Sequence, residues 1–312
     1  MSSRRLLVLA AAALVPVVVG LGTYLAFVWP YAPRPTSQRP AKPFDGTEPA
    51  ELRIDGMPGL RMYLDPTDTV VTRIIATHGK WEADETALFL RTVKPGDTIV
   101  DAGANVGYYT VIGSRLVGDQ GKVYAFEPDP KNFELLRKNV QLNGLTNVVL
   151  ERKALSNRKG TVQLFIADEN KGDHRIYQPV GESRLSVDVE AVRLDEYFQD
   201  HKRGIDFIKI DTQGAEGVIL EGMTGLLERR TDAPTIFMEF WPHALEQLGS
   251  DPGTVVSRLQ SSNYKFYEIR ERLGKQLRAL DPADLLAGLA SGGPDSQTDL
   301  MVLRGGREPP KD

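Results

Sequence analysis

One stretch of the chain constrains its fold more than any other. It runs from Thr98 to Tyr108 as Thr-Ile-Val-Asp-Ala-Gly-Ala-Asn-Val-Gly-Tyr. The apolar run up to Asp101 predicts a buried strand. Gly103 and Gly107 predict a tight turn into a helix, because glycine lets the backbone approach a ligand without a clashing Cβ. We therefore expect a strand–turn–helix unit whose turn faces a ligand.

Strands and helices alternate through the rest of the chain, which is typical of a parallel sheet with helices on both faces. The predicted strands of this sheet are Thr98–Val100, Val123–Phe126, Val148–Leu150, Phe207–Ile210, Thr235–Phe240, Lys265–Ile269 and Leu300–Leu303. The predicted helices are Pro130–Leu142 and Ala215–Leu227. Ahead of the sheet we expect a strand at Val70–Ala76 and a helix at Ala83–Thr92. An insertion adds strand-like stretches, Thr161–Ile166 and Ser186–Val192, joined by the polar loop Asp168–Gly181.

The N-terminus carries an apolar run, Leu6 to Val28, without a charged residue. A helix of this length spans roughly 34 Å, enough to cross a hydrocarbon core of about 30 Å. Trp29 and Tyr31 follow it, as interfacial aromatics do. A cleaved signal peptide is the alternative, but its apolar core is usually only about 7–15 residues long. We therefore predict a transmembrane anchor.

The predicted domain order follows from these segments. Residues 1–29 form the anchor, 30–50 a proline-rich linker, 51–304 an α/β domain with its core at about 79–303, and 305–312 a disordered tail. The positive charges flanking the anchor are nearly balanced, so they leave its orientation open.

Composition excludes several kinds of chemistry. The chain has no cysteine, so disulfides, thiolate catalysis and cysteine-ligated zinc are excluded. Its formal net charge of −4 gives no support for a nucleic-acid partner. The four histidines show no metal-ligand spacing, and we predict no metal site.

The residues of the first turn indicate which ligand it faces. The pattern is Asp-x-Gly-x-Asn-x-Gly, from Asp101 through Asn105 to Gly107, where a dinucleotide fold has Gly-x-Gly-x-x-Gly. An aspartate repels a pyrophosphate but favours the ammonium group of an aminoacyl sulfonium. A second acid, Glu127, ends the next strand, where a carboxylate can accept both ribose hydroxyls of an adenosine. Capping of the following helix is an additional role for Glu127.

Further candidates end the later strands or lie in the insertion. In an open α/β sheet, ligands bind outside the carboxyl ends of the strands, which makes site candidates of several polar residues there. Lys209 lies within one strand, and Asp211 and Glu216 follow it. Glu239 lies at the end of the next strand, and His243 follows it. His174 and Arg175 lie in the insertion loop. Each also has a purely structural interpretation, as an ion pair at a strand end or as a solvated loop residue.

These stretches together resemble the FkbM family of S-adenosylmethionine-dependent methyltransferases. The matching segments are Val93–Thr110, Ala125–Pro128, Lys153–Ser156, Val192–Asp195 and Phe207–Glu216, in family order. The resemblance implies a Rossmann-like class I methyltransferase fold, with a seven-stranded, mostly parallel sheet whose last strand is antiparallel. It also implies that Asp101 and Gly103 face the methionine part of the cofactor, Glu127 the ribose, and the turn with Ala154 and Leu155 the adenine.

We therefore expect methylation of a hydroxyl group on a sugar, a lipid-linked glycan or a natural product. A hydroxyl is weakly acidic, so a general base helps, and Asp211 or His174 is the predicted base. Many family members have glutamate where this chain has Gln213, so Gln213 receives no catalytic role. The alternatives are a nicotinamide-dependent oxidoreductase and a non-catalytic, membrane-tethered nucleotide-binding module. Because the cofactor is made in the cytosol, a single-pass protein with its domain facing the cytoplasm is expected.

Overall fold

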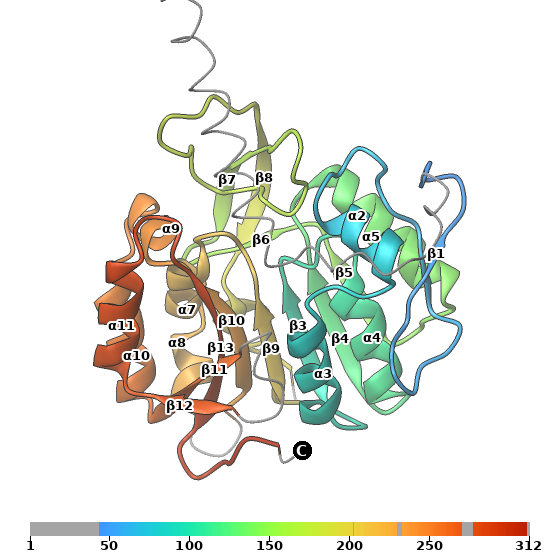
Figure 1. Cartoon of the computed structure of the whole chain (residues 1–312). Coiled ribbons are helices and arrows are strands. Elements are labelled where there is room, and N and C mark those ends of the chain that lie inside the picture. The colour runs from blue at the N-terminus through green and yellow to red at the C-terminus, as the bar shows by residue number, and fades with distance from the viewer. Residues whose placement is uncertain (1–43, 202, 230–232, 270–276, 311–312) are drawn as a thin grey trace, which may run out of the picture. The chain divides into compact units, whose positions relative to one another are not determined.

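A twisted sheet with helices on both faces forms the core of the protein (Figure 1). The computed structural model describes residues 44–201, 203–229, 233–269 and 277–310. The sheet has the strand order β12-β11-β13-β10-β9-β3-β4-β5. Its strands are β3 (Thr98–Ala102), β4 (Lys122–Phe126), β5 (Val148–Glu151), β9 (Phe207–Ile210), β10 (Thr235–Phe240), β11 (Tyr264–Ile269), β12 (Arg278–Leu280) and β13 (Thr298–Arg304).

Strand direction in this sheet matches the expected fold. Strands β5, β4, β3, β9 and β10 are parallel neighbours, and β13 is antiparallel to both β10 and β11. The predicted antiparallel last strand is therefore confirmed. The described sheet has one strand more than the seven expected, because the short β12 adds to the edge of β11. The strand order defines a Rossmann-like α/β fold.

Alternating side chains of the buried strands pack against two helical layers. Ile99, Val123 and Phe207 face α2 (Val71–His78), α3 (Ala83–Thr92) and α4 (Tyr108–Val117). Val100, Ile208 and Ile210 face the other layer. That layer comprises α7 (Glu216–Gly222), α8 (Thr224–Glu228), α10 (Pro252–Ser261) and α11 (Pro282–Ser291). Because both faces are covered, these strands read as nearly continuous apolar runs.

Several helices begin at an Asp-Pro pair. Asp129 accepts hydrogen bonds from the backbone N–H groups of Lys131 and Asn132, and Pro130 starts α5 (Pro130–Leu142). Asp251 and Asp281 cap α10 and α11 in the same way, each followed by proline. An aspartate N-cap with proline in the first turn satisfies free N–H groups and fixes φ in advance.

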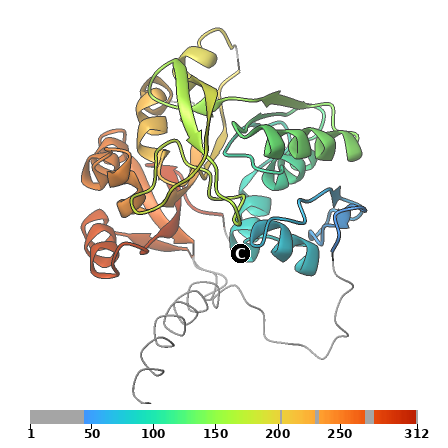
Figure 2. The ribbon, with the colours of Figure 1, turned by 90° about the horizontal axis from the view of Figure 1, so that it is seen from above.

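A second, three-stranded sheet lies above the carboxyl ends of the central strands (Figures 1 and 2). It has the order β6-β8-β7, formed by β6 (Ala154–Leu155), β7 (Gly160–Phe165) and β8 (Ser186–Val192). Near the N-terminal end, β1 (Ala50–Glu51) and β2 (Arg61–Met62) form a two-stranded sheet. The remaining described helices are α6 (Leu194–Tyr197) and α9 (Pro242–Gln247).

Two local predictions are wrong. The expected strand at Val70–Ala76 is helix α2, because Val71 and Ile75 lie one turn apart and both are buried. The β-branched composition of this stretch is overridden by packing of its apolar face. The single helix expected at Ala215–Leu227 is divided at Met223, whose backbone leaves the helical region (φ −124°, ψ 22°), into α7 and α8.

The predicted transmembrane helix is also corrected. Within the ranges that the structure describes, no helix is long and apolar enough to cross a membrane. The longest of them, α5, has 13 residues and extends about 20 Å, against a hydrocarbon core of about 30 Å. The predicted anchor at 1–29 lies outside the described residues. A single-pass membrane location with a domain facing the cytoplasm is therefore not supported. The linker at 30–50 and the tail at 305–312 are only partly described, and those boundaries stay predictions.

Candidate active site

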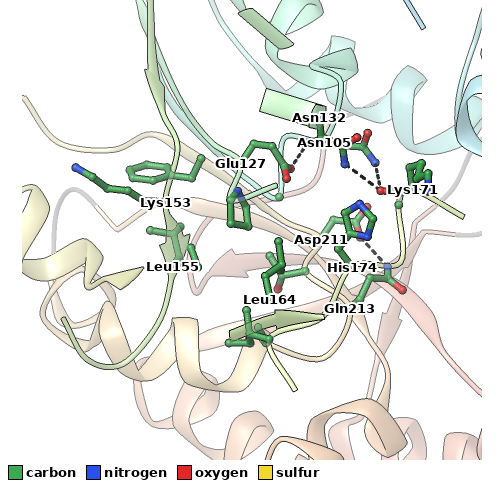
Figure 3. Close-up of a pocket in the computed structure, with 18 residues that line it drawn as sticks. Asn105, Glu127, Asn132, Lys153, Leu155, Leu164, Lys171, His174, Asp211 and Gln213 are labelled. Carbon is green, nitrogen blue, oxygen red and sulfur yellow. Dashed lines mark hydrogen bonds between the residues drawn. The ribbon is translucent and has the colours of Figure 1, made fainter. Parts of the chain in front are cut away.

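A pocket opens at the carboxyl ends of β3, β4 and β9, beneath the three-stranded sheet (Figure 3). Its volume, counted out to the open mouth, is about 550 Å³. The residues lining it are Gly103, Asn105, Phe126, Glu127, Pro128, Asn132, Lys153, Ala154, Leu155, Leu164, Lys171, Gly172, His174, Ile176, Asp211, Thr212, Gln213 and Ala215.

The turn after β3 passes very close to the end of β9. Gly103 has φ 82°, and a Cβ there would lie 2.0 Å from the carbonyl oxygen of Asp211. The neighbouring backbone therefore requires glycine at this position. Gly107 begins α4 with φ 93°, and a Cβ there would meet the Leu136 side chain at 2.6 Å. Gly107 does not line the pocket.

Glu127 sits in the pocket wall at the end of β4. One carboxylate oxygen accepts the Asn105 backbone N–H at 2.7 Å, and the other accepts the Asp129 N–H at 2.8 Å. Burial raises the pKa of Glu127 to about 8, although these hydrogen bonds favour the ionised form. Each oxygen keeps a further lone pair for a hydroxyl donor. Glu127 is therefore fixed in orientation and suited to bind a pair of hydroxyls.

An apolar slot adjoins Glu127. Ala154 and Leu155 form β6, and both are buried. Together with Phe126, Leu164 and Ile176 they line this side of the pocket. The adenine position expected at Ala154 and Leu155 stays a prediction.

Asp101 lies under the first turn and is not part of the pocket wall. Its carboxylate accepts a hydrogen bond from the Thr110 hydroxyl at 2.5 Å. In the parallel register it pairs with Lys209 on β9. Burial raises the pKa of Asp101 to about 6. The position of Asp101 next to the turn is as predicted, but its direct contact with the cofactor stays a prediction.

Lys209 is the centre of a buried ion cluster. Its ammonium nitrogen lies 2.8 Å from Glu85, 3.3 Å from Asp211 and 3.8 Å from Glu82. It also lies 4.5 Å from the centre of the Tyr109 ring, a cation–π distance. Burial alone would lower the pKa of Lys209, but the carboxylates, Glu85 first, hold it well above its usual value. Lys209 is therefore a permanent cation behind the pocket wall.

Asp211 is the acid of this cluster that faces the pocket. About a quarter of its side chain (26%) is exposed. The Gln213 amide donates to Asp211 at 3.1 Å (Figure 3). The same amide donates to Glu239 at 3.0 Å, so it joins the two carboxyl groups. Burial, followed by repulsion from Asp211, raises the pKa of Glu239 well above its usual range. Asp211 is thus held from both sides, by Lys209 and by Gln213.

His174 also lines the pocket, but neither of its ring nitrogens is available to accept a proton. Nδ1 faces the Ala167 backbone N–H at 3.0 Å and therefore acts as an acceptor. Burial lowers the pKa of His174, which favours the neutral ring. The proton of the neutral ring then sits on Nε2, which lies 4.0 Å from Asp129. With this tautomer neither nitrogen has a free lone pair, so the geometry favours Asp211 over His174 as the base.

The other sequence candidates lie away from the pocket. Glu216 accepts hydrogen bonds from Thr212 and Gly214 and closes the turn before α7, with burial raising its pKa to about 7. His243 is exposed on α9. Arg175 is buried, bonded to Asp173 and stacked on Trp241.

Sequence reasoning missed two parts of the site. Asn132 donates to the Lys171 carbonyl and so holds the insertion loop over the pocket, which no local pattern indicates. Glu82 enters the Lys209 cluster from the segment before α3. Gln213, which has no predicted role, lies two residues after Asp211, and this short spacing is the sequence signal for its contact with that carboxyl group.

Comparison with known proteins identifies the family. The model of the methyltransferase FkbM domain matches residues 101–266, more than half of the chain. The chain belongs to the FkbM methyltransferase family, as the sequence resemblance predicted, and its cofactor is S-adenosylmethionine. This leaves no support for the nicotinamide-dependent alternative.

Several curated relatives are methyltransferases. Methyltransferase sdnD of Sordaria araneosa is 32% identical over 155 residues, which cover 40% of this chain and 60% of that protein. The hexuronic acid methyltransferase AglP of Haloferax volcanii is 27% identical over 149 residues, which cover 47% of this chain and 58% of that protein. The chain thus spans about three fifths of the length of these relatives.

Solved methyltransferase structures are also similar. An O-methyltransferase from Thermotoga maritima has a TM-score of 0.35 at 14% identity, covering 73% of this chain and 66% of that one. Fibrillarin from Aeropyrum pernix, solved with S-adenosyl-L-methionine, has a TM-score of 0.38 at 12% identity. The match covers 71% of this chain and 76% of the fibrillarin chain. With scores this low, the fold assignment rests on the strand order described above.

Proposed function

We propose that the protein transfers a methyl group from S-adenosylmethionine to a hydroxyl of a sugar, a lipid-linked glycan or a natural product. The observation that carries the proposal is the arrangement of the pocket. A fixed carboxyl group, Glu127, and several apolar side chains line the pocket, and a second carboxyl group, Asp211, lines it too. Glu127 suits the ribose, the slot formed with Leu155 suits the adenine, and Asp211 remains for the acceptor.

The residues present fit the cofactor chemically. It combines a purine, a ribose diol and a cationic methionine part, and the pocket lining includes apolar side chains, a hydroxyl acceptor and a carboxyl group. We assign Gly103, Asn105, Glu127, Ala154 and Leu155 to its binding. Asp101 and Gly107 support the turn from behind.

Asp211 is the proposed general base. When bound, the cofactor supplies a methyl group on a positively charged sulfur, which keeps the bonding pair when the acceptor oxygen takes the methyl. Asp211 accepts the hydroxyl proton as the new oxygen–carbon bond forms. Lys209 and Gln213 hold its two oxygens in place, so the carboxylate is oriented before the acceptor arrives.

A transfer assay tests this function. The protein is incubated with methyl-labelled S-adenosylmethionine and a panel of neutral sugars, uronic acids, glycolipids and polyketide alcohols, and labelled products are sought by mass spectrometry. We expect label on the oxygen of at least one class, and its loss in Asp211→Asn. Cofactor binding without transfer to any acceptor, in a panel that a control O-methyltransferase methylates, would favour the non-catalytic module.

A further inference from the structure

One segment of the insertion lies over the pocket. We call residues 166–174 the strap. Lys171, Gly172 and His174 of the strap line the pocket together with Glu127. Glu127 is 5% exposed, so a pair of ligand hydroxyls can reach its carboxylate only if a covering segment moves. The contacts of the strap make it the segment suited to such a movement.

The strap is held together by its own contacts. Its two ends meet, because Phe165 and Arg175 exchange backbone hydrogen bonds of 2.7 and 3.1 Å. Inside it, Nδ1 of His174 accepts the Ala167 N–H at 3.0 Å, and the Lys171 ammonium donates to the Ala167 carbonyl at 3.1 Å. A compact loop with adjacent ends, packed by its own side chains, is an Ω-loop. The strap can therefore move as one unit about its joined ends.

Hydrogen bonds join the strap to the segment that precedes α2. The Glu169 carbonyl accepts the Thr69 N–H at 3.0 Å and the Thr69 hydroxyl at 3.2 Å. The Lys171 N–H donates to the Asp68 carboxylate at 3.3 Å. Asp68 and Thr69 therefore hold the strap from the N-terminal side of the domain.

The opposite side of the strap is joined to the turn that orients Glu127. The Lys171 carbonyl accepts the Asn132 amide at 3.0 Å and the Asn105 amide at 3.4 Å (Figure 3). The backbone N–H of Asn105 donates to Glu127 at 2.7 Å. One residue, Asn105, thus contacts both the strap and the carboxylate proposed to bind the ribose.

The composition of the strap makes its opening inexpensive in free energy. Between Ala167 and His174, Ala167 is the one apolar side chain. The strap is therefore held down by hydrogen bonds, whose net contribution is small because water replaces them when they break. Segments with few buried apolar contacts open locally while the core stays folded.

We infer that the strap is a gate over the cofactor pocket, latched by Asp68 and Asn132, whose opening controls both entry of the methyl donor and release of the product. The inference rests on the proposed function, because it takes the pocket lined by Glu127 as the cofactor site. The closed gate keeps water from the donor during transfer. The open gate lets the product leave, so exchange of the two ligands requires the latch to break.

A gate has a kinetic signature that a fixed wall lacks. Ligand enters and leaves through the open state, so the association rate constant kon and the dissociation rate constant koff both scale with the fraction of open molecules. Loss of one latch hydrogen bond should raise this fraction roughly fivefold. Both rate constants then rise together, and Kd, which is their ratio, stays nearly constant. With a fixed wall, loss of a contact changes koff and leaves kon unchanged.

Surface plasmon resonance of the full chain with S-adenosylhomocysteine, comparing wild type with Asp68→Ala, tests the inference. Asp68 does not line the pocket, so its removal takes no contact from the ligand. We expect kon and koff each to rise about fivefold, with Kd within about twofold of wild type. Asp68 also caps α2 by accepting the Thr72 N–H at 2.8 Å. The matched control is therefore Asp251→Ala, which removes the cap of α10 and should leave both rate constants unchanged.

A crosslink makes the opposite change. Thr69 and Glu169 are exposed and their backbones are hydrogen-bonded, and the chain has no cysteine of its own. The double variant Thr69→Cys and Glu169→Cys is therefore treated with a bismaleimide whose bridge can be reduced. We expect kon and koff to fall at least about tenfold in the crosslinked protein, and to recover when the bridge is reduced. If Asp68→Ala does not fold, the crosslinked protein decides the question.

The outcomes separate the inference from the proposed function. Wild-type rate constants in the crosslinked protein, or an unchanged kon in folded Asp68→Ala, overturn the inference while leaving the proposed function intact. Failure of the wild-type protein to bind S-adenosylhomocysteine refutes the proposed function itself, and the inference with it.

Discussion

Replacing Gly103 by alanine is the change whose consequence can be worked out most fully. The new Cβ would lie 2.0 Å from the Asp211 carbonyl oxygen, whereas ordinary contacts begin at 3.4 Å, so the two backbones must separate by about 1.4 Å (3.4 minus 2.0). An alanine at φ 82° adds about 1–2 kcal/mol of conformational strain. The separation also strains the hydrogen bond from the Asp211 N–H to the Ala102 carbonyl, which measures 3.0 Å.

We expect Gly103→Ala to lower the free energy of unfolding by about 2–4 kcal/mol. It should weaken S-adenosylhomocysteine binding at least about tenfold, because the loop with Asp211 leaves its place. Urea unfolding and calorimetry measure the two effects. The control is Gly107→Ala, which has a similar positive φ but meets only the flexible end of Leu136. It should lose stability and keep the affinity. If Gly103→Ala binds the ligand as wild type does, the close approach of the two backbones has no functional role.

Three other expectations follow from the same geometry. Asp211→Asn should lower the rate of methyl transfer about a hundredfold or more while leaving the Kd of S-adenosylhomocysteine within about threefold; an unchanged rate would remove Asp211 as the base. His174→Ala should keep kcat within about threefold. It should lower the free energy of unfolding by about 1–2 kcal/mol, since the buried Ala167 N–H loses its acceptor. A loss of kcat as large as that of Asp211→Asn would identify His174 as the base instead. Burial raises the pKa of Glu127 to about 8 and of Glu216 to about 7, so the folded state holds protons that the unfolded state has released. The free energy of unfolding measured in urea titrations should therefore fall by about 1 kcal/mol or more from pH 6.5 to pH 8. Glu216→Gln should make this pH dependence smaller, and a free energy of unfolding that rises with pH would contradict the reasoning.

The sequence predicted the parallel sheet well because its buried strands carry a strong local pattern. The strands Phe207–Ile210 and Thr235–Phe240 and the helix Pro130–Leu142 have the predicted bounds. Helices α10 and α11 were missed although Asp251-Pro252 and Asp281-Pro282 carry the same start signal as Asp129-Pro130. Helix α2 was mistaken for a strand because its β-branched residues hide a helical spacing.

Site residues at the end of a strand could be predicted from the sequence. Residues that reach the site from distant parts of the chain could not. Glu127 and Asp211 line one pocket, as parallel strands require of their carboxyl ends. Glu82 joins the site through an ion pair with Lys209, 127 positions further along the chain (209 minus 82), and no local pattern encodes that contact. The protonation of His174 depends on the N–H of Ala167, which only the folded insertion loop brings to the ring.

We propose that this pocket holds an adenosine-containing methyl donor with Glu127 at the ribose. Calorimetric titration with S-adenosylhomocysteine, and separately with NADH, tests it most directly. We expect that S-adenosylhomocysteine binds, that NADH does not, and that Glu127→Ala abolishes binding while the protein still unfolds cooperatively. Binding of NADH, or full affinity for S-adenosylhomocysteine in Glu127→Ala, would contradict it.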